Sequence, residues 1–245
     1  MFINTKDESR RTFNFSFFME RGNVAMTRGS QEIKVKNINR ELITMASLVE
    51  KQIYESMLSL KNNDIELANK VINNDDEVDQ MQKIIEEQCI KFIASEQPLA
   101  TDLRKIMTAS KIVTDLERMA DHAVDICKLT KKIGANINLF KKCLGNLWEM
   151  EKKVREMIGS AIDSYIKNDD EMAYKICKKD DEIDSFYKSL FTEFVDKMKD
   201  DESLTEKGIS LLFVIRYLER IGDRVTNICE STVYTKSGAY VDLNE

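Results

Sequence analysis

The sequence predicts an all-α fold in which an antiparallel three-helix bundle is duplicated in tandem. Three observations predict it: a composition that suits helices, an internal repeat, and apolar residues at helical spacing. The 245 residues include one proline and eight glycines, too few for the turns of a many-stranded sheet. With 42% hydrophobic residues, the chain also has enough apolar side chains to form a core.

Charge and apolar patterning exclude several functional classes. The formal net charge is −6, and no basic run is interleaved with aromatic residues, so nucleic acid is not expected as a partner. The longest apolar run, residues 209–215, has seven residues and is far too short to cross a membrane. The start of the chain is too polar for a secretory signal peptide. The five cysteines form no CxxC pair and are expected to be buried thiols in a reducing cytoplasm.

Two blocks of the sequence occur twice. Residues 63–79 and 168–184 are identical at nine of seventeen positions. Farther along, LERMADHAVDIC (116–127) matches LERIGDRVTNIC (218–229) at six of twelve positions. The offset falls from 105 to 102 residues between the two blocks, so the first copy carries three extra residues, which we place near Pro98. The chain is therefore one unit used twice.

Each unit is predicted to contain three helices. The first helix carries an apolar stripe at three- and four-residue steps from Leu42 to Leu60 and ends near residues 61–64. The second covers about 64–94, and the third continues to about Gly134, a suitable residue to end a helix. In the second unit the corresponding ranges are about 138–166, 169–199 and 204–233. Helices of about 30 residues span roughly 45 Å, so each unit is expected to be elongated.

The predicted domain boundaries follow from the repeat. Residues 35–134 form the first three-helix bundle, and residues 138–235 form the second. Residues 236–245 are a C-terminal tail. Residues 1–34 have no duplicate and are predicted to be an N-terminal extension, either disordered or encoded upstream of a natural start at Met26.

Pairs of carboxylates recur at the same places in both units. The four pairs are Asp75 with Asp79, Asp180 with Asp184, Glu117 with Asp121, and Glu219 with Asp223. A spacing of four places both members of a pair on one stripe of a helix, where like charges repel. Asp125 extends the stripe of the first unit, whereas Asn227 stands at that position in the second. One such pair is a weak signal among 43 acidic residues, but all four survive while about half of the surrounding positions have diverged.

Two interpretations of these carboxylates remain open from the residues alone. Carboxylates converging from two neighbouring helices would form an all-oxygen pocket that suits hard or borderline cations. A carboxylate di-iron site is not expected, because it needs Glu-x-x-His pairs and the chain has one histidine, His122, which Arg224 replaces in the second unit. The alternative is a solvated acidic face whose charges pair with Arg118, Arg220 and nearby lysines.

The repeated motifs resemble those of the PhoU family of phosphate-uptake regulators over about residues 38–233. The segments that carry the resemblance are DLERMADHAVDI (115–126), YLERIGDRVTNICE (217–230), QPLATDLR (97–104), MASLVEKQI (45–53) and the doubled DDEVD/DDEID. The resemblance implies two similar three-helix bundles side by side, whose carboxylates bind iron, zinc, manganese, nickel or magnesium as divalent or trivalent ions. By position it implies one metal site of Asp75, Asp79, Glu117, Asp121 and Asp125, and another of Asp180, Asp184, Glu219, Asp223 and Asn227.

The resemblance also implies a function. It predicts a non-enzymatic, cytoplasmic adaptor between the ATPase subunit of a phosphate ABC transporter and a sensor histidine kinase, acting as a negative regulator of the phosphate regulon. A homodimer is expected, with membrane association only through these partners. Three features depart from the family pattern: Asn227 in place of Asp125, the absence of a second QPLATDLR segment, and the long stretch 1–34.

Two other classes of function compete with this prediction. The first is a metal-storage or metal-dependent hydrolytic helical bundle, although the sequence shows no Ser-His-Asp, Cys-His or ExxH grouping. The second is a plain helical scaffold whose acidic stripes are only solvated.

Overall fold

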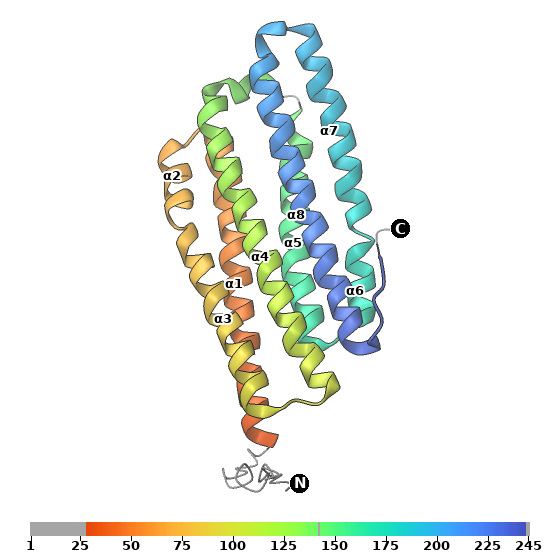
Figure 1. Cartoon of the computed structure of the whole chain (residues 1–245). Coiled ribbons are helices and arrows are strands. Elements are labelled where there is room, and N and C mark those ends of the chain that lie inside the picture. Colours follow the sequence, from red (N-terminus) through yellow and green to blue (C-terminus); the bar gives the residue numbers. More distant parts are fainter. Residues whose placement is uncertain (1–27, 142, 244–245) are drawn as a thin grey trace, which may run out of the picture.

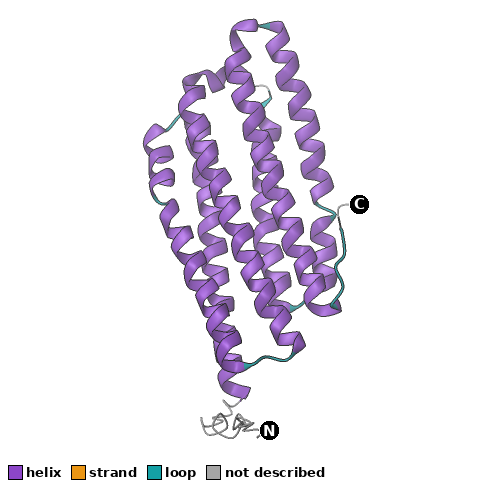
Figure 2. Cartoon of the chain, viewed as in Figure 1, coloured by secondary structure: helices purple, strands orange, loops and turns teal. Residues whose placement is uncertain are grey.

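The structure is a computed structural model that describes residues 28–141 and 143–243. Within these ranges every regular element is a helix, and none is a strand (Figure 2), which confirms the all-α prediction. The helices are α1 (Arg28–Asn62), α2 (Ile65–Asn73), α3 (Asp75–Glu96), α4 (Ala100–Ile133), η2 (Gly134–Phe140), α5 (Leu144–Lys167), α6 (Asp170–Cys177), α7 (Asp180–Asp200), η3 (Glu202–Leu204) and α8 (Thr205–Ser237).

The two units lie side by side, as the repeat predicts. The first unit consists of α1, α2, α3 and α4, and the second of α5, α6, α7 and α8 (Figure 1). Helices α4 and α8 run antiparallel against each other at the centre, and α1 and α5 pack together behind them. We call the contact between α4 and α8 the central seam.

One hydrophobic core runs through both units. The predicted apolar stripe of α1 is buried, with Leu42, Val49 and Ile53 each 0% exposed. The equivalent residues Leu116 on α4 and Leu218 on α8 are likewise 0% exposed, and both belong to the same continuous cluster. Because the units share this core, they are expected to fold as one body. No helix in the described part of the chain is long and apolar enough to cross a membrane.

The second helix of each unit is broken, which differs from the prediction. Asn74 separates α2 from α3, and the residues before Asp180 separate α6 from α7. As a result Asp75 and Asp180 are the first residues of α3 and α7. A carboxylate is favoured there, because the unpaired N–H groups of a helix start carry partial positive charge.

The turns before α2 and α6 match each other residue by residue. Asp64 and Asp169 cap these helices, and each side chain accepts a hydrogen bond of 2.9 Å from a backbone N–H of the first turn. The preceding residues, Asn63 and Asn168, adopt left-handed φ angles of 52° and 53°, which asparagine tolerates better than most residues. The local geometry of the turn has thus been duplicated together with its sequence.

Helix α5 starts later than predicted. Residues 138–140 belong to the 3-10 helix η2, so that α5 begins at Leu144 rather than near residue 138. Phe140 accounts for this difference, because its ring is buried edge-to-face against Phe194 of α7, 5.8 Å between centroids. Gly134, the predicted end of α4, has a positive φ of 58°, a conformation that suits glycine.

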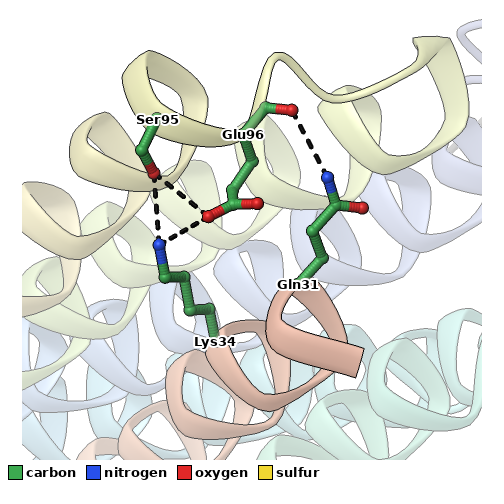
Figure 3. A network of polar contacts seen from close by, with 4 residues as sticks. All are labelled: Gln31, Lys34, Ser95 and Glu96. Atoms are coloured by element: carbon green, nitrogen blue, oxygen red, sulfur yellow. Dashed lines mark hydrogen bonds and ion pairs between the residues drawn. The ribbon is translucent and has the colours of Figure 1, made fainter. Parts of the chain in front are cut away.

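Residues 28–34, which were predicted to belong to the N-terminal extension, form the first two turns of α1. They are fastened to the end of α3 (Figure 3). Lys34 Nζ lies 2.5 Å from Glu96 Oε1, and Gln31 Nε2 donates to the Glu96 carbonyl oxygen at 3.3 Å. The Glu96 side chain is fully shielded from water, so this start of α1 is an integral part of the bundle. The prediction for residues 1–27, including the start at Met26, lies outside the described residues.

Candidate metal sites on the acidic helix faces

The carboxylates of the second unit converge from two helices. Asp180 and Asp184 of α7 and Glu219 and Asp223 of α8 line one hollow of about 490 Å³. Sequence reasoning did not find one further wall of this hollow, Leu243 of the C-terminal tail. No pattern in the sequence connects the tail with the repeat, so only the fold could reveal this neighbour.

Asp180 approaches the backbone of α8 closely. A Cβ atom added to Gly222 would lie 2.7 Å from Asp180 Oδ1, so the glycine provides the space for this carboxylate. The pKa of Asp180 is raised from 3.8 to about 7, first by burial and then by neighbouring carboxylates, with Asp223 foremost. At the equivalent position of the first unit stands Ala120, which leaves less room beside α4.

The two carboxylate oxygens of Glu219 differ in their partners. Oε1 forms an ion pair with Arg216 one turn earlier on α8, whereas Oε2 is buried and accepts no hydrogen bond from any residue that the structure describes. Burial and then the charge of Asp223 raise the pKa of Glu219 above its usual range. A buried acceptor without a donor is unfavourable, and a bound cation in the hollow would supply the missing partner.

The carboxylates of the first unit are also near one another. The pKa of Asp75 on α3 is raised to about 6 by burial and then by the charges of Asp121 and Asp79. Burial also raises the pKa values of Glu117 and Asp121 on α4, and the charge of Asp79 adds to both. The structure therefore brings together the four carboxylates that the two helices were predicted to share.

The last residues of the two predicted sets, Asp125 and Asn227, differ in where the fold places them. Asp125 forms an ion pair of 2.9 Å with Lys128, a residue that the sequence analysis did not single out. Asn227 does not line the hollow of Asp180 and Glu219; it lines another hollow at the central seam, together with Asp115 and Arg224. Of the ten predicted site residues, Asn227 is therefore the one that the fold places apart from its set.

His122 is held in the central seam and faces an aromatic ring. Its ring stacks on that of Tyr217 with 5.3 Å between centroids, and its Nδ1 atom is buried without a hydrogen-bond partner. Burial, followed by the charges of Arg220 and Arg224, lowers the pKa of His122 to about 4. The imidazole is therefore neutral at physiological pH.

The donor chemistry of both acidic groups fits hard cations, but the side chains are not gathered around one point. Among the described residues, no three His, Cys, Asp or Glu side chains are close enough together to hold a metal ion as they stand. The role of these carboxylates as metal ligands stays a prediction.

Fold and site together define a class of protein: an all-α bundle of two repeated units, each with neighbouring carboxylates on its last two long helices. The PhoU domain model matches residues 42–130 and 147–232, one match in each unit. The chain belongs to the PhoU family.

Known relatives agree with this assignment over most of the chain. The phosphate-specific transport system accessory protein PhoU homolog of Clostridium acetobutylicum is 45% identical over 221 residues, which cover 90% of this chain and 100% of that protein. The crystal structure of the phosphate transport system regulatory protein PhoU from Streptococcus pneumoniae has a TM-score of 0.79 at 30% identity and covers 86% of this chain and 99% of that one. PhoU from Pseudomonas aeruginosa has a TM-score of 0.76 at 30% identity, with coverage of 85% and 99%.

Proposed function

We propose that this chain is an accessory regulator of phosphate transport that represses uptake and the phosphate-starvation response. Support comes from the family membership, which extends over both units, and from relatives named as accessory or regulatory proteins of phosphate transport. The proposed partners are the ATPase subunit of a phosphate ABC transporter and a sensor histidine kinase. The protein acts in the cytoplasm, as a homodimer, and reaches the membrane only through these partners.

A pull-down from native cells grown at high and at low phosphate tests this proposal. Recovery of a transporter ATPase or a histidine kinase supports the adaptor role. Recovery of neither under both conditions contradicts it. Light scattering of the purified protein measures the oligomeric state separately, and a monomer would contradict the dimer.

We further propose binding rather than catalysis as the mode of action. The groups that usually act as nucleophile or base are poorly suited to it here. The thiols of Cys89 and Cys127 are buried, and burial raises their pKa values to about 11 and about 12. The single histidine is neutral and stacked in the seam. Sustained turnover of a generic phosphoester by the metal-loaded protein would overturn this inference and favour a metal-dependent hydrolase.

The proposed ligands of the two carboxylate groups are multivalent cations. The observation that carries this is the second hollow, where Asp180 lies against Gly222 and the buried Glu219 Oε2 has no donor. Asp180, Asp184, Glu219 and Asp223 would hold one ion or cluster; Asp75, Asp79, Glu117 and Asp121 would hold the other. The bound cation would neutralise the acidic face and present positive charge to an anionic partner.

Elemental analysis of the double variant Glu219→Ala, Asp223→Ala tests the metal proposal. The variant should lose the metal of the second hollow while its far-UV circular dichroism stays unchanged. The matched variant Glu117→Ala, Asp121→Ala should lose the metal of the first unit's carboxylate group. Full metal content in both variants would refute the assignment.

A further inference from the structure

The central seam contains two hollows that the internal repeat relates to each other. Their volumes are about 400 and 410 Å³. Equivalent positions, offset by 102 residues, line both: Lys111 and Phe213, Asp115 and Tyr217, Ser231 and Leu129. The duplication has therefore produced one hollow twice. We call the copy around Lys111 and Asp115 the polar hollow and the copy around Phe213 and Tyr217 the apolar hollow.

The contacts across the central seam differ in the same way as the hollows beside them: the contact is charged beside the polar hollow and aromatic beside the apolar hollow. Beside the polar hollow, Arg224 Nη1 of α8 donates to Asp115 Oδ1 of α4 at 3.2 Å. The equivalent residues beside the apolar hollow are His122 and Tyr217, and they form the aromatic stack described above. Both pairs fill the seam, so packing alone does not require the charged version.

More cationic side chains than carboxylates line the polar hollow. Lys111, Arg118 and Arg224 all line it. Within the described ranges of the chain, neither Lys111 nor Arg118 has a carboxylate at ion-pair distance, although acidic residues outnumber basic ones by 43 to 37 in the sequence. The Lys111 ammonium instead donates to the Tyr240 hydroxyl at 3.3 Å and lies 4.9 Å from the centre of that ring.

Both carboxylates that line the polar hollow already accept hydrogen bonds, and neither does so from Lys111 or Arg118. Asp115 accepts from Arg224, and burial raises its pKa despite that partner. Glu230 Oε1 accepts the backbone N–H of Leu243 at 3.0 Å and so holds the C-terminal tail. Among the described residues, Lys111 and Arg118 thus lie in the hollow with no carboxylate at ion-pair distance, in a protein whose net charge is −6.

The C-terminal tail forms one wall of the polar hollow. Tyr240 and Val241 line it, and the Tyr240 ring stacks on Tyr234 of α8 with 4.3 Å between centroids. The apolar hollow has no such wall among its lining residues. The tail therefore gives the polar hollow a wall that its copy lacks, and this wall adds a phenol hydroxyl to it.

We propose that the polar hollow binds a phosphate group, either as inorganic phosphate or as part of a larger phosphorylated molecule. The forked guanidinium groups of Arg118 and Arg224 suit the oxygens of a tetrahedral anion, and Lys111 adds a point charge. Ser231 of α8 and Tyr240 of the tail add hydroxyl groups to the lining. The volume lies within the range of about 300–1,000 Å³ typical of small-molecule sites, which leaves room for more than the phosphate group itself.

Calorimetric titration of the full-length protein in the presence of a chelator tests this proposal without involving the metal sites. The ligands are sodium phosphate, ATP and, as an ionic-strength control, sodium chloride. Phosphate or ATP is expected to bind, and chloride is not. Arg118→Gln and Lys111→Gln should each raise the Kd about tenfold. Lys132→Gln removes the same charge at the apolar hollow and should leave the Kd unchanged.

The variants also distinguish the polar hollow from its neighbour. Arg118 and Arg224 additionally line a hollow shared with Arg220 and His122. A loss of binding in Arg220→Gln combined with full binding in Lys111→Gln would place the anion there and overturn the proposal. Equal weakening by Lys132→Gln, or no heat from phosphate and ATP at about 10 mM, would also overturn it. Tighter binding of ATP than of phosphate would support a larger phosphorylated molecule as the ligand.

Discussion

Replacing Asp180 by asparagine should stabilise the metal-free protein while weakening its proposed metal site. Asp180 lies against Gly222 and faces the carboxylates of Asp184, Glu219 and Asp223. Its pKa is raised from 3.8 to about 7, which at about 1.36 kcal/mol per pKa unit corresponds to roughly 4 kcal/mol. Because the side chain is only half-buried, screening by water reduces this to about 1–2 kcal/mol.

The sign of the pH dependence follows from proton binding. The unfolded chain ionises Asp180 near 3.8 and the folded protein near 7, so that between these values the folded protein holds more protons. The free energy of unfolding therefore falls as the pH rises from about 4 to about 7. Above about pH 7 the ionised Asp180 destabilises the fold by the full amount. Asp180→Asn removes this dependence, since the amide does not ionise.

Urea unfolding in a chelating buffer measures the effect. At about pH 8 the variant should unfold with a free energy about 1–2 kcal/mol higher than the wild type, and the gain should shrink at about pH 4. Asp196→Asn, an exposed carboxylate farther along the same helix and outside the hollow, should change stability by less than about 0.5 kcal/mol. A variant that is less stable than the wild type at about pH 8 would refute the reasoning, because repulsion would then not dominate at Asp180.

Three further predictions follow from packing and charge. Gly222→Ala should push the Asp180 carboxylate aside and weaken metal binding in the second hollow about tenfold by calorimetry, with far-UV circular dichroism unchanged; wild-type affinity would contradict the close approach. Lys34→Met removes the ammonium group that pairs with Glu96, whose side chain is shielded from water. Lys34 lowers the pKa of Glu96. The ion pair therefore stabilises the fold above the usual glutamate pKa, and this stabilisation is lost as acid protonates Glu96. The free energies of unfolding of the wild type and the variant, followed by circular dichroism at several pH values, should therefore differ at neutral pH and converge in acid. Leu116→Ala should cost about 3 kcal/mol and lower the Tm of one single transition by about 6–12 °C, and two separate transitions in calorimetry would show that the units do not share a core.

The acidic pairs show how far the sequence alone could reach. Their recurrence in both units identified the four pairs, because duplication leaves a record in the order of residues. The sequence did not show that α3 and α7 begin at Asp75 and Asp180, since both interruptions of the helix lie inside segments with continuous helical periodicity. It also grouped Asn227 with the second site, whereas α8 presents that residue to the seam beside Asp115. The direction of a side chain at the edge of a helix depends on which neighbours pack there, and spacing along the chain does not specify them.

The polar hollow illustrates the same limit from the other side. Alignment of the two units pairs Lys111 with Phe213 and Asp115 with Tyr217, but these substitutions carry no meaning until α4 and α8 are seen to cross. Likewise, no pattern in the sequence indicates that Tyr240 and Leu243 of the tail line two different hollows.

The sequence by itself determined the helical class, the duplication and the residues that the two units retain, because helical period and internal repetition are written in local order. The tertiary structure alone decided which carboxylates share a hollow, which of them lose contact with water, and where, among the described residues, a cationic side chain lies away from every carboxylate. These properties depend on desolvation and on charges brought together from helices far apart in the sequence. The closeness of Asp180 to Gly222 and of Arg224 to Asp115 is therefore a property of the folded bundle.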